Sequence, residues 1–291
     1  FEHGVSKVEE LSGQFLRSGL IDTLGNFILK PKFVTLSSFN QYGLAVAELG
    51  SSPSKFTLVN KKGQTVTSLA FRSIEPFSEG LARVQYHDNW GFVDTTGKLV
   101  IEATFFKASD FSEGLAAVWQ NGQCGFIDKT GKYAVEPQFS KCMDFKDGKA
   151  IVFKGSQRAG LIDTTGKFII EPGINKLLDF ADGRGLVRDD NYKFYYITEQ
   201  ARFYNGFYEK ASQYRHGVAV VQIDGNWAII NQQGIEIIPP KYDKIEQFED
   251  GFAKVRIKGF NGLTNLQGEL IVQPSYEYIS YPGEGLFRVE Q

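Results

Sequence analysis

The sequence has few cysteines and histidines and no long apolar run, and each of these shortages argues against one class of protein or site. Its two cysteines, Cys124 and Cys142, are too few for a disulfide framework and are not spaced as a Cys-x-x-Cys pair. They can form one bond at most, and we expect two small buried apolar side chains instead. The three histidines are scattered, without the paired spacing of a zinc site. No apolar run reaches the roughly 18 residues of a transmembrane helix, so we expect no transmembrane segment.

Charge of one sign is not in excess either. The 32 basic and 34 acidic residues leave a net charge of −2, which gives no electrostatic footprint for nucleic acid or an anionic membrane. The chain also lacks a Gly-x-Ser-x-Gly elbow, a P-loop and a dinucleotide fingerprint. Aspartates such as Asp94 recur singly, and Asn60 or Asn231 replaces them in other copies, which favours turn closure over calcium binding. We therefore predict no enzyme, no cofactor, no metal site and no nucleic-acid partner.

Aromatic residues and glycine are what the chain does contain. It has 25 Phe, 13 Tyr and 31 Gly, against three Trp and one Met. Phenylalanine and tyrosine favour the half-buried surfaces of sheets, and frequent glycine indicates many tight turns. With a hydrophobic content of 42%, which is enough for a core, these numbers predict an all-β protein.

Residues 77–105 and 111–139 share nearly the same pattern, and this pattern runs through the chain. Three sets of markers keep a period of 34 or 35 residues after slightly longer first steps. The first is a glycine at positions 43, 80, 114, 148, 183, 217, 251 and 285. The second is a turn glycine at 25, 63, 97, 131, 166, 234 and 268, with a vacancy near Gln200. The third is an aromatic or branched residue at 33, 71, 105, 139, 174, 208, 242 and 276. This periodicity predicts a tandem array of eight units.

Each unit has the pattern of three short antiparallel strands, exemplified by residues 80–84, 90–94 and 98–102. The turn Asp94-Thr-Thr-Gly97 has the chemistry of a type I turn followed by a left-handed glycine. Pro137, in a Pro-x-Phe segment, is predicted to mark the end of the third strand. The residue before the first glycine is Glu, Asp or His in different units, which predicts a solvated turn.

A three-stranded unit cannot bury both faces alone, so the units must pack in series. We predict one β domain over residues 1–291, an all-β tandem array of eight three-stranded repeats that forms a curved solenoid or a propeller-like toroid. A ninth copy of the first strand at residues 281–289 favours an open arc, because a closed ring needs whole units. One unit, at about residues 184–217, is irregular.

These motifs resemble the WG-repeat family, also called KWG repeats, of bacterial proteins. The resemblance rests on Asn89-Trp-Gly-Phe-Val-Asp94, Phe77-Ser-Glu-Gly80 and Asp94-Thr-Thr-Gly97 with Lys98, and it covers essentially the whole chain. It implies a β-rich repeat module, often attached to other domains or on exported proteins, without an assigned biochemical role. Only Trp90 and Trp227 keep the signature tryptophan. By position, the same site holds Ser18, Phe56, Cys124, Ala159, Lys193 and Asn261, and the next glycine is replaced by Thr57, Phe194 and Ala228.

Residues 188–216 break the repeat pattern. The turn aspartate and glycine are missing there, and nine aromatic residues crowd together with Arg188, Arg202 and Arg215. Tyrosine and arginine are enriched at binding hot spots and sugar-stacking platforms. The alternative interpretation is that a degenerate unit fills its core with aromatic rings. The predicted binding residues are Tyr192, Phe194, Tyr195, Tyr196, Arg202, Tyr204, Phe207 and Arg215.

The leading functional hypothesis is a non-enzymatic scaffold for protein–protein interaction. A carbohydrate- or cell-wall-binding module at the bacterial cell surface is the alternative, and a catalytic site assembled across units in a central channel is a third hypothesis. The sequence itself does not fix the compartment. The family resemblance favours an exported or cell-surface location over the cytoplasm.

Overall fold

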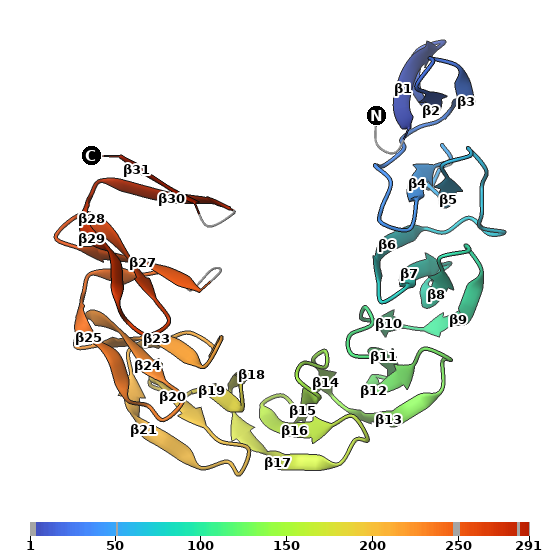
Figure 1. Cartoon of the computed structure of the whole chain (residues 1–291). Helices are drawn as coiled ribbons and strands as arrows, with labels where there is room; N and C mark the ends of the chain where they lie inside the picture. Colours follow the sequence, from blue (N-terminus) through green and yellow to red (C-terminus); the bar gives the residue numbers. More distant parts are fainter. Residues whose placement is uncertain (1–3, 51, 247–250, 284–285, 291) are drawn as a thin grey trace. The chain divides into compact units, whose positions relative to one another are not determined.

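The computed structural model describes residues 4–50, 52–246, 251–283 and 286–290, which form strands and tight turns (Figure 1). Within these ranges the chain contains no helix, as its composition predicts. Internal packing divides the chain into two units, Phe1–Phe145 and Lys146–Gln291. The single domain over residues 1–291 and its open or closed form stay predictions.

The described residues of the first unit form strands β1 to β14. Their bounds are β1 Val5–Ser12, β2 Phe15–Asp22, β3 Phe27–Phe33, β4 Leu44–Glu48, β5 Phe56–Asn60, β6 Ser73–Ser78, β7 Leu81–Tyr86, β8 Asn89–Asp94, β9 Leu99–Phe105, β10 Lys107–Ala108, β11 Leu115–Gln120, β12 Gln123–Asp128, β13 Tyr133–Phe139 and β14 Lys141–Cys142.

The described residues of the second unit form strands β15 to β31. Their bounds are β15 Lys149–Lys154, β16 Arg158–Asp163, β17 Phe168–Asn175, β18 Leu177–Ala181, β19 Arg184–Arg188, β20 Phe194–Ile197, β21 Phe203–Tyr208, β22 Lys210–Ala211, β23 Val218–Ile223, β24 Asn226–Asn231, β25 Glu236–Tyr242, β26 Lys244–Ile245, β27 Phe252–Ile257, β28 Phe260–Asn265, β29 Leu270–Tyr276, β30 Tyr278–Gly283 and β31 Leu286–Glu290.

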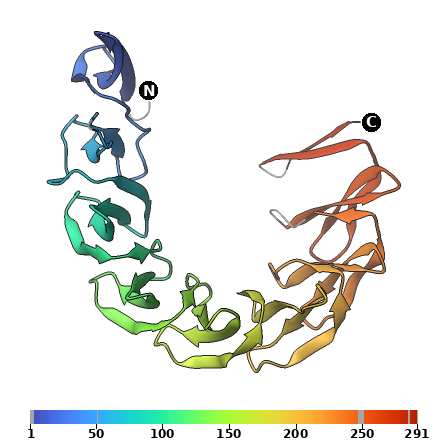
Figure 2. The same cartoon turned by 180° about the vertical axis from the view of Figure 1, so that it is seen from behind.

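Consecutive strands pair antiparallel, so each sheet is a meander in chain order (Figures 1 and 2). Complete sheets are β6-β7-β8-β9 and β10-β11-β12-β13 in the first unit, and β18-β19-β20-β21, β22-β23-β24-β25 and β26-β27-β28-β29 in the second. They have four strands where three were predicted, because the residues before the Phe-Ser-Glu-Gly turn add a strand such as β10. The final hairpin β30-β31 overlaps the predicted ninth copy at residues 281–289.

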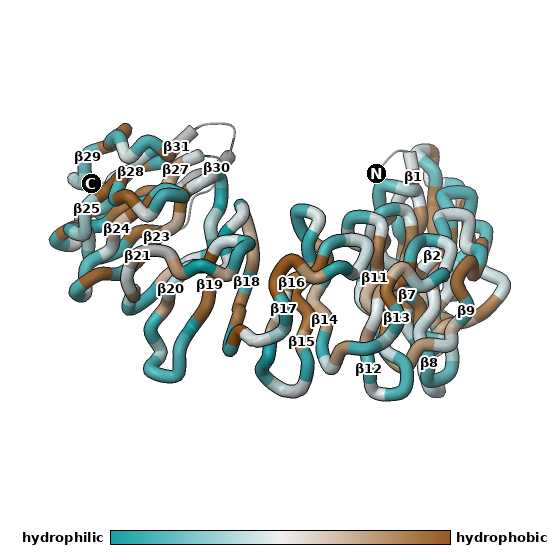
Figure 3. The backbone as a smooth tube through the Cα atoms, turned by 90° about the horizontal axis from the view of Figure 1, so that it is seen from below, coloured by the Kyte–Doolittle hydropathy of each residue, from teal (hydrophilic) through white to brown (hydrophobic). Residues whose placement is uncertain are grey.

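The core lies between consecutive sheets of each unit. One apolar cluster joins Phe92 of β8 and Phe105 of β9 to Val118 and Ile127 of the next sheet. The middle strands are therefore buried on both faces, and neighbouring residues such as Phe92 and Val93 are both inaccessible to solvent. Figure 3 shows the same division along the chain, with hydrophobic residues mainly in strands and hydrophilic residues in most loops.

The repeated aspartates close the turn between the second and third strands, as predicted. Asp94 Oδ1 accepts hydrogen bonds from the N–H groups of Thr96 (2.8 Å) and Lys98 (3.0 Å). Gly97 follows with a left-handed φ of 85°. Partial burial acts to raise the pKa of Asp94, but the hydrogen bonds outweigh it and the pKa is lowered. Asn231 makes the same bonds to residues 233 and 235, which confirms that closure does not need a charge.

The Phe-Ser-Glu-Gly turn is exposed to solvent at Glu79 and Glu113, as predicted, and it also links neighbouring repeats. Glu79 and Gly80 have left-handed φ angles of 50° and 87°, as a two-residue type I′ hairpin requires. Glu79 Oε2 accepts a hydrogen bond from the N–H of Gly114 (2.9 Å), in the equivalent turn of the next repeat. The same oxygen lies 3.1 Å from Lys129 Nζ. Burial acts to raise the pKa of Glu79, but Lys129 and the N–H of Gly114 outweigh it, so the pKa is lowered.

The other positions of this turn repeat the link. Ser78 Oγ donates to the carbonyl oxygen of Phe111 at 2.7 Å, again one repeat further along. In the second unit, Asp182 Oδ2 accepts from the N–H of Gly217 at 2.9 Å. Serine and the acidic residue of one repeat therefore fix the turn of the following repeat, and this ladder of hydrogen bonds joins sheets that are not paired strand to strand.

The glycine of the Trp-Gly motif faces the third strand at close range. A Cβ atom on Gly125 would lie 2.3 Å from Val135 O and 2.6 Å from Pro137 N. Gly91, Gly160 and Gly262 meet the backbone of their third strands in the same way, at 2.5–2.7 Å. Side-chain carbon atoms do not approach backbone this closely, so the crossing of the third strand favours glycine, and Ala228 is the exception in β24.

The third strand crosses there because it carries a bulge. Cys124 pairs with Phe139 and Phe126 pairs with Val135, so three residues, 136–138, lie opposite Gly125 alone, and two of them are extra. Pro137 lies in this bulge, two residues before the end of β13. The prediction that proline marks the strand end is corrected: proline is tolerated inside an edge strand because the bulge needs no ladder hydrogen bond from it.

The tryptophan position packs against the short first strand of the next sheet. Trp90 packs on the cluster that contains Ala108 of β10. At the equivalent position of the next repeat, Cys124 of β12 is bonded to Cys142 of β14 in a disulfide. The expectation of two unbonded cysteines was therefore wrong, although both are buried as expected.

Candidate functional site

The sheet β18-β19-β20-β21 contains the irregular unit, and its register corrects the alignment made from sequence. In β8 and β9 the tryptophan pairs with the last residue of the third strand, and in this sheet the equivalent pair is Phe194 with Tyr208. Phe194, not Lys193, therefore occupies the tryptophan position, and Tyr195, not Phe194, occupies the glycine position. The shift arises because five residues lie between the paired residues Arg188 and Phe194, whereas four lie between the equivalent pair Gln85 and Trp90.

The turn that closes β20 and β21 keeps its geometry with different residues. Thr198 Oγ1 accepts from the N–H groups of Gln200 (3.2 Å) and Arg202 (3.4 Å), as the aspartates do elsewhere. Ala201 takes the left-handed conformation of the missing glycine, with a φ of 56°. The turn is therefore present in a weaker form, because a hydroxyl replaces a carboxylate and alanine replaces glycine.

A tyrosine at the glycine position is possible because β21 follows a different path. This strand has six residues, whereas β9 and β13 have seven. Its bulge contains Gly206 in a left-handed conformation (φ 71°), where β13 has Pro137. The shorter strand bends at Gly206, and this leaves room for the side chain of Tyr195.

Three aromatic rings gather on one face of β20 and β21, and we call them the aromatic patch: Tyr195, Phe203 and Phe207. The ring centroid of Tyr195 lies 4.9 Å from that of Phe203 and 5.7 Å from that of Phe207. Phe203 is 72% exposed and Phe207 is 65% exposed. Burial, with Asp189 nearby, raises the pKa of Tyr195, so its phenol stays neutral at ordinary pH. The patch is an uncharged surface of packed rings.

The opposite face of the same strands belongs to the core. Tyr196, Tyr208 and Tyr214 are buried, and the rings of Tyr196 and Tyr214 meet edge-on with centroids 4.7 Å apart. Tyr196 Oη donates to the carbonyl oxygen of Ser212. Tyr196 was predicted to bind a partner, and this is corrected: its ring fills the space between two sheets. Phe194 is half-buried and packs on the same cluster.

The β19–β20 loop places a further exposed ring apart from the patch. Tyr192 is 68% exposed and has a left-handed φ of 62°. The guanidinium of Arg188 lies 5.3 Å from its ring centroid, within cation–π range. Lys176 Nζ forms an ion pair with Asp190 at 2.6 Å beside it. Tyr192 is thus an accessible side chain held by a neighbouring cation.

Arg202 and Arg215, the remaining predicted residues, are exposed at separate points. Arg202 directly precedes Phe203 at one end of β21, whereas Arg215 lies in the turn before β23. The side chain of Tyr204 lies outside the described residues. Of the predicted set, the structure therefore brings Tyr195 and Phe207 to one surface, and Phe203 is the residue that sequence reasoning left out of its list.

A second exposed apolar group lies in the first unit and was not predicted. Leu11, Phe15 and Leu16 are 69%, 66% and 53% exposed at the tip of the β1–β2 hairpin. The available signal was their position beside Gly13, where a hairpin tip is ordinarily polar. The group covers the end of a single hairpin and has no ordered ring contact comparable to that of the aromatic patch among the described residues.

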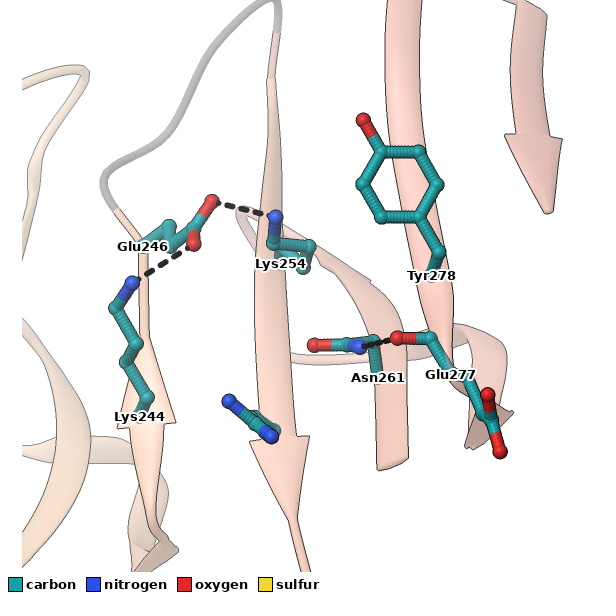
Figure 4. A pocket seen from close by; sticks show the side chains of 7 residues that line it. Lys244, Glu246, Lys254, Asn261, Glu277 and Tyr278 are labelled. Atoms are coloured by element: carbon teal, nitrogen blue, oxygen red, sulfur yellow. Dashed lines mark hydrogen bonds and ion pairs between the residues drawn. The ribbon is translucent and has the colours of Figure 1, made fainter. Parts of the chain in front are cut away.

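A polar hollow of about 220 Å³ opens beside β26, β27 and β28 (Figure 4). In it, Glu246 lies 3.0 Å from both Lys244 and Lys254, and Asn261 Nδ2 donates to the carbonyl oxygen of Glu277 at 2.7 Å. Burial acts to raise the pKa of Glu246, but the two lysines outweigh it and the pKa is lowered. The lining as a whole carries three cations, Lys244, Lys254 and Arg256, against the carboxylates of Glu246 and Glu277.

The described residues hold neither a cluster of metal ligands nor a membrane-spanning helix. No group of three or more His, Cys, Asp or Glu side chains is placed to hold a metal ion there. No helix of the described chain has the length and apolar character to cross a membrane.

Known structures resemble the chain only distantly. A computationally designed protein, Ika8, has 12% identity over 88% of this chain and 94% of its own, with a TM-score of 0.42. BamB from Moraxella catarrhalis has 13% identity over 80% of this chain and 82% of its own, with a TM-score of 0.39. Dihydro-heme d1 dehydrogenase NirN has 12% identity over 84% of this chain and 67% of its own, with a TM-score of 0.42. With TM-scores below 0.5, these likenesses say nothing of this chain's function. No curated protein sequence matches the chain.

One repeat family does match along the chain. The family described as WG containing repeat matches residues 19–51, 56–90, 90–124, 125–156, 160–192, 208–227, 227–259 and 262–291. These are eight matches, as many as the predicted units. The interval between the fifth and sixth matches, residues 193–207, contains all three residues of the aromatic patch. Because the matches cover most of the sequence, the chain belongs to the WG-repeat family.

Proposed function

We propose that this WG-repeat chain is a non-enzymatic scaffold that binds a protein partner through the aromatic patch. The observation that carries the proposal is the high exposure of Phe203 and Phe207 in β21, 72% and 65%. Exposed aromatic groups in contact with one another are typical of binding surfaces and disfavoured elsewhere. At the position of Phe207, directly before the recurring aromatic or branched residue, the other third strands carry Lys32, Thr104, Gln138, Gly173, Lys241 and Ser275. The position of Phe203 is aromatic in other repeats too, as at Phe27, so it is Phe207 that departs from the repeat pattern.

The chemistry of the patch favours a protein over a glycan. Phe203 and Phe207 carry no hydrogen-bonding group, and the phenol of Tyr195 is the one polar group of the three side chains. Sugar sites combine ring stacking with several converging donors and acceptors, whereas protein hot spots are apolar at the centre with a polar rim. Arg202, exposed beside Phe203, supplies such a rim.

The disulfide supports placing the chain in an oxidising compartment. Cys124 and Cys142 are buried and bonded, and such bonds persist mainly in exported proteins. An exported location is part of this proposal and is consistent with a surface that meets a partner outside the cytoplasm.

Site-specific photo-crosslinking tests the proposed function. In cells that express the chain naturally, p-benzoylphenylalanine replaces Phe207, and the crosslinked protein is identified by mass spectrometry. The purified partner is then titrated against the wild-type chain and a Phe203→Ser/Phe207→Ser double variant. Loss of at least about tenfold in affinity is expected, because central aromatic residues each contribute more than about 1 kcal/mol at hot spots.

The matched control is Phe106, which is 76% exposed just after β9 in the first unit. A crosslinker at position 106 captures a different set of proteins or none, and Phe106→Ser leaves the affinity unchanged. An equal loss of affinity from Phe106→Ser and from the double variant contradicts the proposal, because binding would then reflect non-specific contact with any exposed aromatic residue. A glycan array that retains the wild-type chain and releases the double variant would assign the patch to carbohydrate instead.

A further inference from the structure

We infer that the hollow beside β26, β27 and β28 binds a small aromatic carboxylate, with the ring at the tryptophan position of the repeat and the carboxylate on Arg256. The site is built from other strands than the aromatic patch, so the inference does not depend on the proposed function. Three observations carry it: an asparagine where two other repeats have tryptophan, the cations around that position, and an arginine beside it.

Asn261 of β28 occupies the position that tryptophan has in two other repeats. In the strand ladder it pairs with the last residue but one of β27 and with the last residue of β29, as Trp90 and Trp227 do in their own sheets. The amide of Asn261 is much smaller than an indole ring, and its Nδ2 donates to the carbonyl oxygen of Glu277 at 2.7 Å. A small side chain at the place of a large one leaves a cavity unless the neighbours fill it.

The neighbouring side chains do not fill this space. Trp227 packs on the cluster that contains Ile245, 18 residues further along, and the residue 18 positions after Asn261 is again an isoleucine, Ile279. Tyr278 lines the hollow beside Asn261, but it stays 51% exposed (Figure 4). The hollow of about 220 Å³ therefore includes the space that an indole ring takes in the other repeats.

The cations that contact tryptophan elsewhere in the chain have equivalents around this hollow. In the β6–β9 sheet the guanidinium of Arg83 lies 4.7 Å from the tryptophan ring centroid, and in the β22–β25 sheet Lys210 Nζ lies 5.7 Å from it. By register, Lys254 has the place of Arg83 and Lys244 has the place of Lys210. Both lysines line the hollow. A flat ring bound there would therefore lie within reach of cation–π contacts.

Arg256 adds a cation that the tryptophan-containing sheets do not have at this point. It pairs with Asn261, whereas the residue that pairs with tryptophan is a glutamine in the β6–β9 and β22–β25 sheets, Gln85 and Gln222. Arg256 is exposed and forms no ion pair within the described part of the chain. A guanidinium binds a carboxylate through two parallel hydrogen bonds. The last complete sheet thus combines a vacant ring position with a group suited to an anion.

The lining of the hollow holds more positive than negative charge. Glu246 lies 3.0 Å from both Lys244 and Lys254. Figure 4 shows the carboxylate of Glu277 turned away from these lysines. Of the described lining residues, one carboxylate therefore faces three cations, and Arg256 is the cation that it leaves without a negative partner.

Other carboxylates near the hollow do not reverse this excess. Asp243 Oδ2 accepts a hydrogen bond from the N–H of Lys258 at 2.6 Å, and Lys258 itself brings a further positive charge. Glu290, opposite Tyr278, forms an ion pair with Arg288 at 2.7 Å. Residues 249 and 250 are acidic and lie outside the described residues; they precede the start of β27, whereas Arg256 is near its end. The surroundings therefore favour a ligand with negative charge.

Ligand-observed NMR titration of the wild-type chain tests the inference. The probe is indolepropionate; the controls are tryptamine, which has the same ring with an ammonium group, and butyrate, which has a carboxylate and no ring. Indolepropionate is expected to bind at least about tenfold more tightly than either control. Equal affinity of tryptamine or of butyrate overturns the inference, and so does the absence of saturable indolepropionate binding at millimolar concentration.

Two substitutions by residues from other repeats localise the binding. Asn261→Trp places the repeat's own ring in the hollow and should abolish the binding of indolepropionate. Arg256→Gln introduces the residue of the equivalent strands, and it should weaken binding at least about tenfold and remove the preference over tryptamine. Lys258→Gln is the matched control, because it removes an exposed cation that does not line the hollow, and it should leave the affinity unchanged.

Circular dichroism shows whether each variant is folded. A folded Asn261→Trp variant that binds indolepropionate like the wild type would place the ligand elsewhere and overturn the inference. Equal losses from Arg256→Gln and Lys258→Gln would overturn it as well, because net charge alone would then explain the binding. The Phe203→Ser/Phe207→Ser variant should bind indolepropionate normally, so failure of this inference and failure of the proposed function are distinguishable.

Discussion

The close crossing of the third strand makes a quantitative prediction about two glycines in one hairpin. A Cβ atom on Gly160 of β16 would lie 2.7 Å from Ile170 O and 2.9 Å from Pro172 N. A Cβ atom on Gly173 of β17 would meet nothing closer than Glu171 O at 3.9 Å. Neither glycine has a left-handed φ, so the two substitutions by alanine differ in the space available and not in backbone strain.

The expected free energies follow from two opposing effects. Replacing glycine by alanine restricts the unfolded chain and stabilises the protein by about 0.4–1 kcal/mol where the side chain fits. Forcing a group into a filled site costs about 1–3 kcal/mol. Gly173→Ala should therefore raise the free energy of unfolding by about 0.5–1 kcal/mol. Gly160→Ala should lower it by about 1–2 kcal/mol, since the steric cost exceeds the gain.

Urea unfolding followed by circular dichroism measures both variants, and hydrogen exchange of β16 and β17 localises the effect. Because repeat arrays need not unfold in one step, exchange in this hairpin is the more direct measure. The reasoning is refuted if Gly160→Ala is as stable as the wild type with unchanged protection in both strands. Ala228 occupies the same position in β24, fully buried. A backbone shift therefore accommodates one methyl group there, and this bounds the expected cost from above.

Three further predictions concern the turns and the disulfide. Reduction of the Cys124–Cys142 bond, which closes a separation of 18 residues, should lower the free energy of unfolding by about 3 kcal/mol, measured as a drop in the thermal midpoint on adding reductant. Glu79→Ala should cost about 1 kcal/mol at pH 7 by removing the inter-repeat hydrogen bond. Because the folded pKa of Glu79 is lowered, its contribution is present above the unfolded pKa near about 4.3 and is lost as pH falls through the folded value. Asp94→Asn should stay within about 0.5 kcal/mol of the wild type and Asp94→Ala should cost about 1 kcal/mol, compared by thermal melts at pH 7.

Each of these predictions has an outcome that contradicts it. A thermal midpoint that does not respond to reductant would show that the disulfide adds nothing to stability. A Glu79→Ala variant whose stability deficit persisted unchanged at pH 3 would show that the lost interaction did not depend on the carboxylate. Equal losses from Asp94→Asn and Asp94→Ala would mean that the amide cannot replace the carboxylate, against the bonds that Asn231 makes.

The period and the turn chemistry were predictable from sequence because each depends on a single residue type at a fixed place. A glycine with left-handed φ, such as Gly80 or Gly97, can be recognised in the sequence even when the residues around it differ between repeats. The register of the irregular unit was not predictable in the same way. There, one extra residue precedes Phe194, and β21 has one residue fewer than the equivalent strands β9 and β13. The two changes cancel, so the repeating residues before and after this unit keep their spacing. Only the residues between them shift, and Tyr195 thereby takes the position that glycine has in other repeats.

The disulfide could have been predicted from the repeat, had the contact between repeats been known. Trp90 packs on the cluster that contains Ala108, and Trp227 packs on the cluster that contains Ile245. Both pairs are separated by 18 residues, which is also the separation of the two bonded cysteines. Sequence spacing gave this number, but only the packing of one sheet on the next shows that the two positions meet.

The division of the aromatic residues between surface and core also needed the structure. Tyr195 and Tyr196 are adjacent and chemically identical, and alternation along a strand places one on the patch and the other inside. Which face is which depends on the neighbouring sheet that covers Tyr196 and Tyr208. Local sequence contains no information on that neighbour.

The ladder of Phe-Ser-Glu-Gly turns has a consequence for how such a gene changes length. Recombination between the coding regions of residues 77–105 and 111–139, which share their pattern, adds or removes one whole unit. Deletion of residues 80–113 joins Glu79 directly to Gly114 and so regenerates a complete Phe-Ser-Glu-Gly turn at the junction. A deletion of half that length, residues 80–96, removes strands β7 and β8 and leaves β9 without the strands it packs beside. Selection at the protein level therefore permits changes in steps of a full repeat, and the irregular unit can lie at different distances from the ends of arrays of different length.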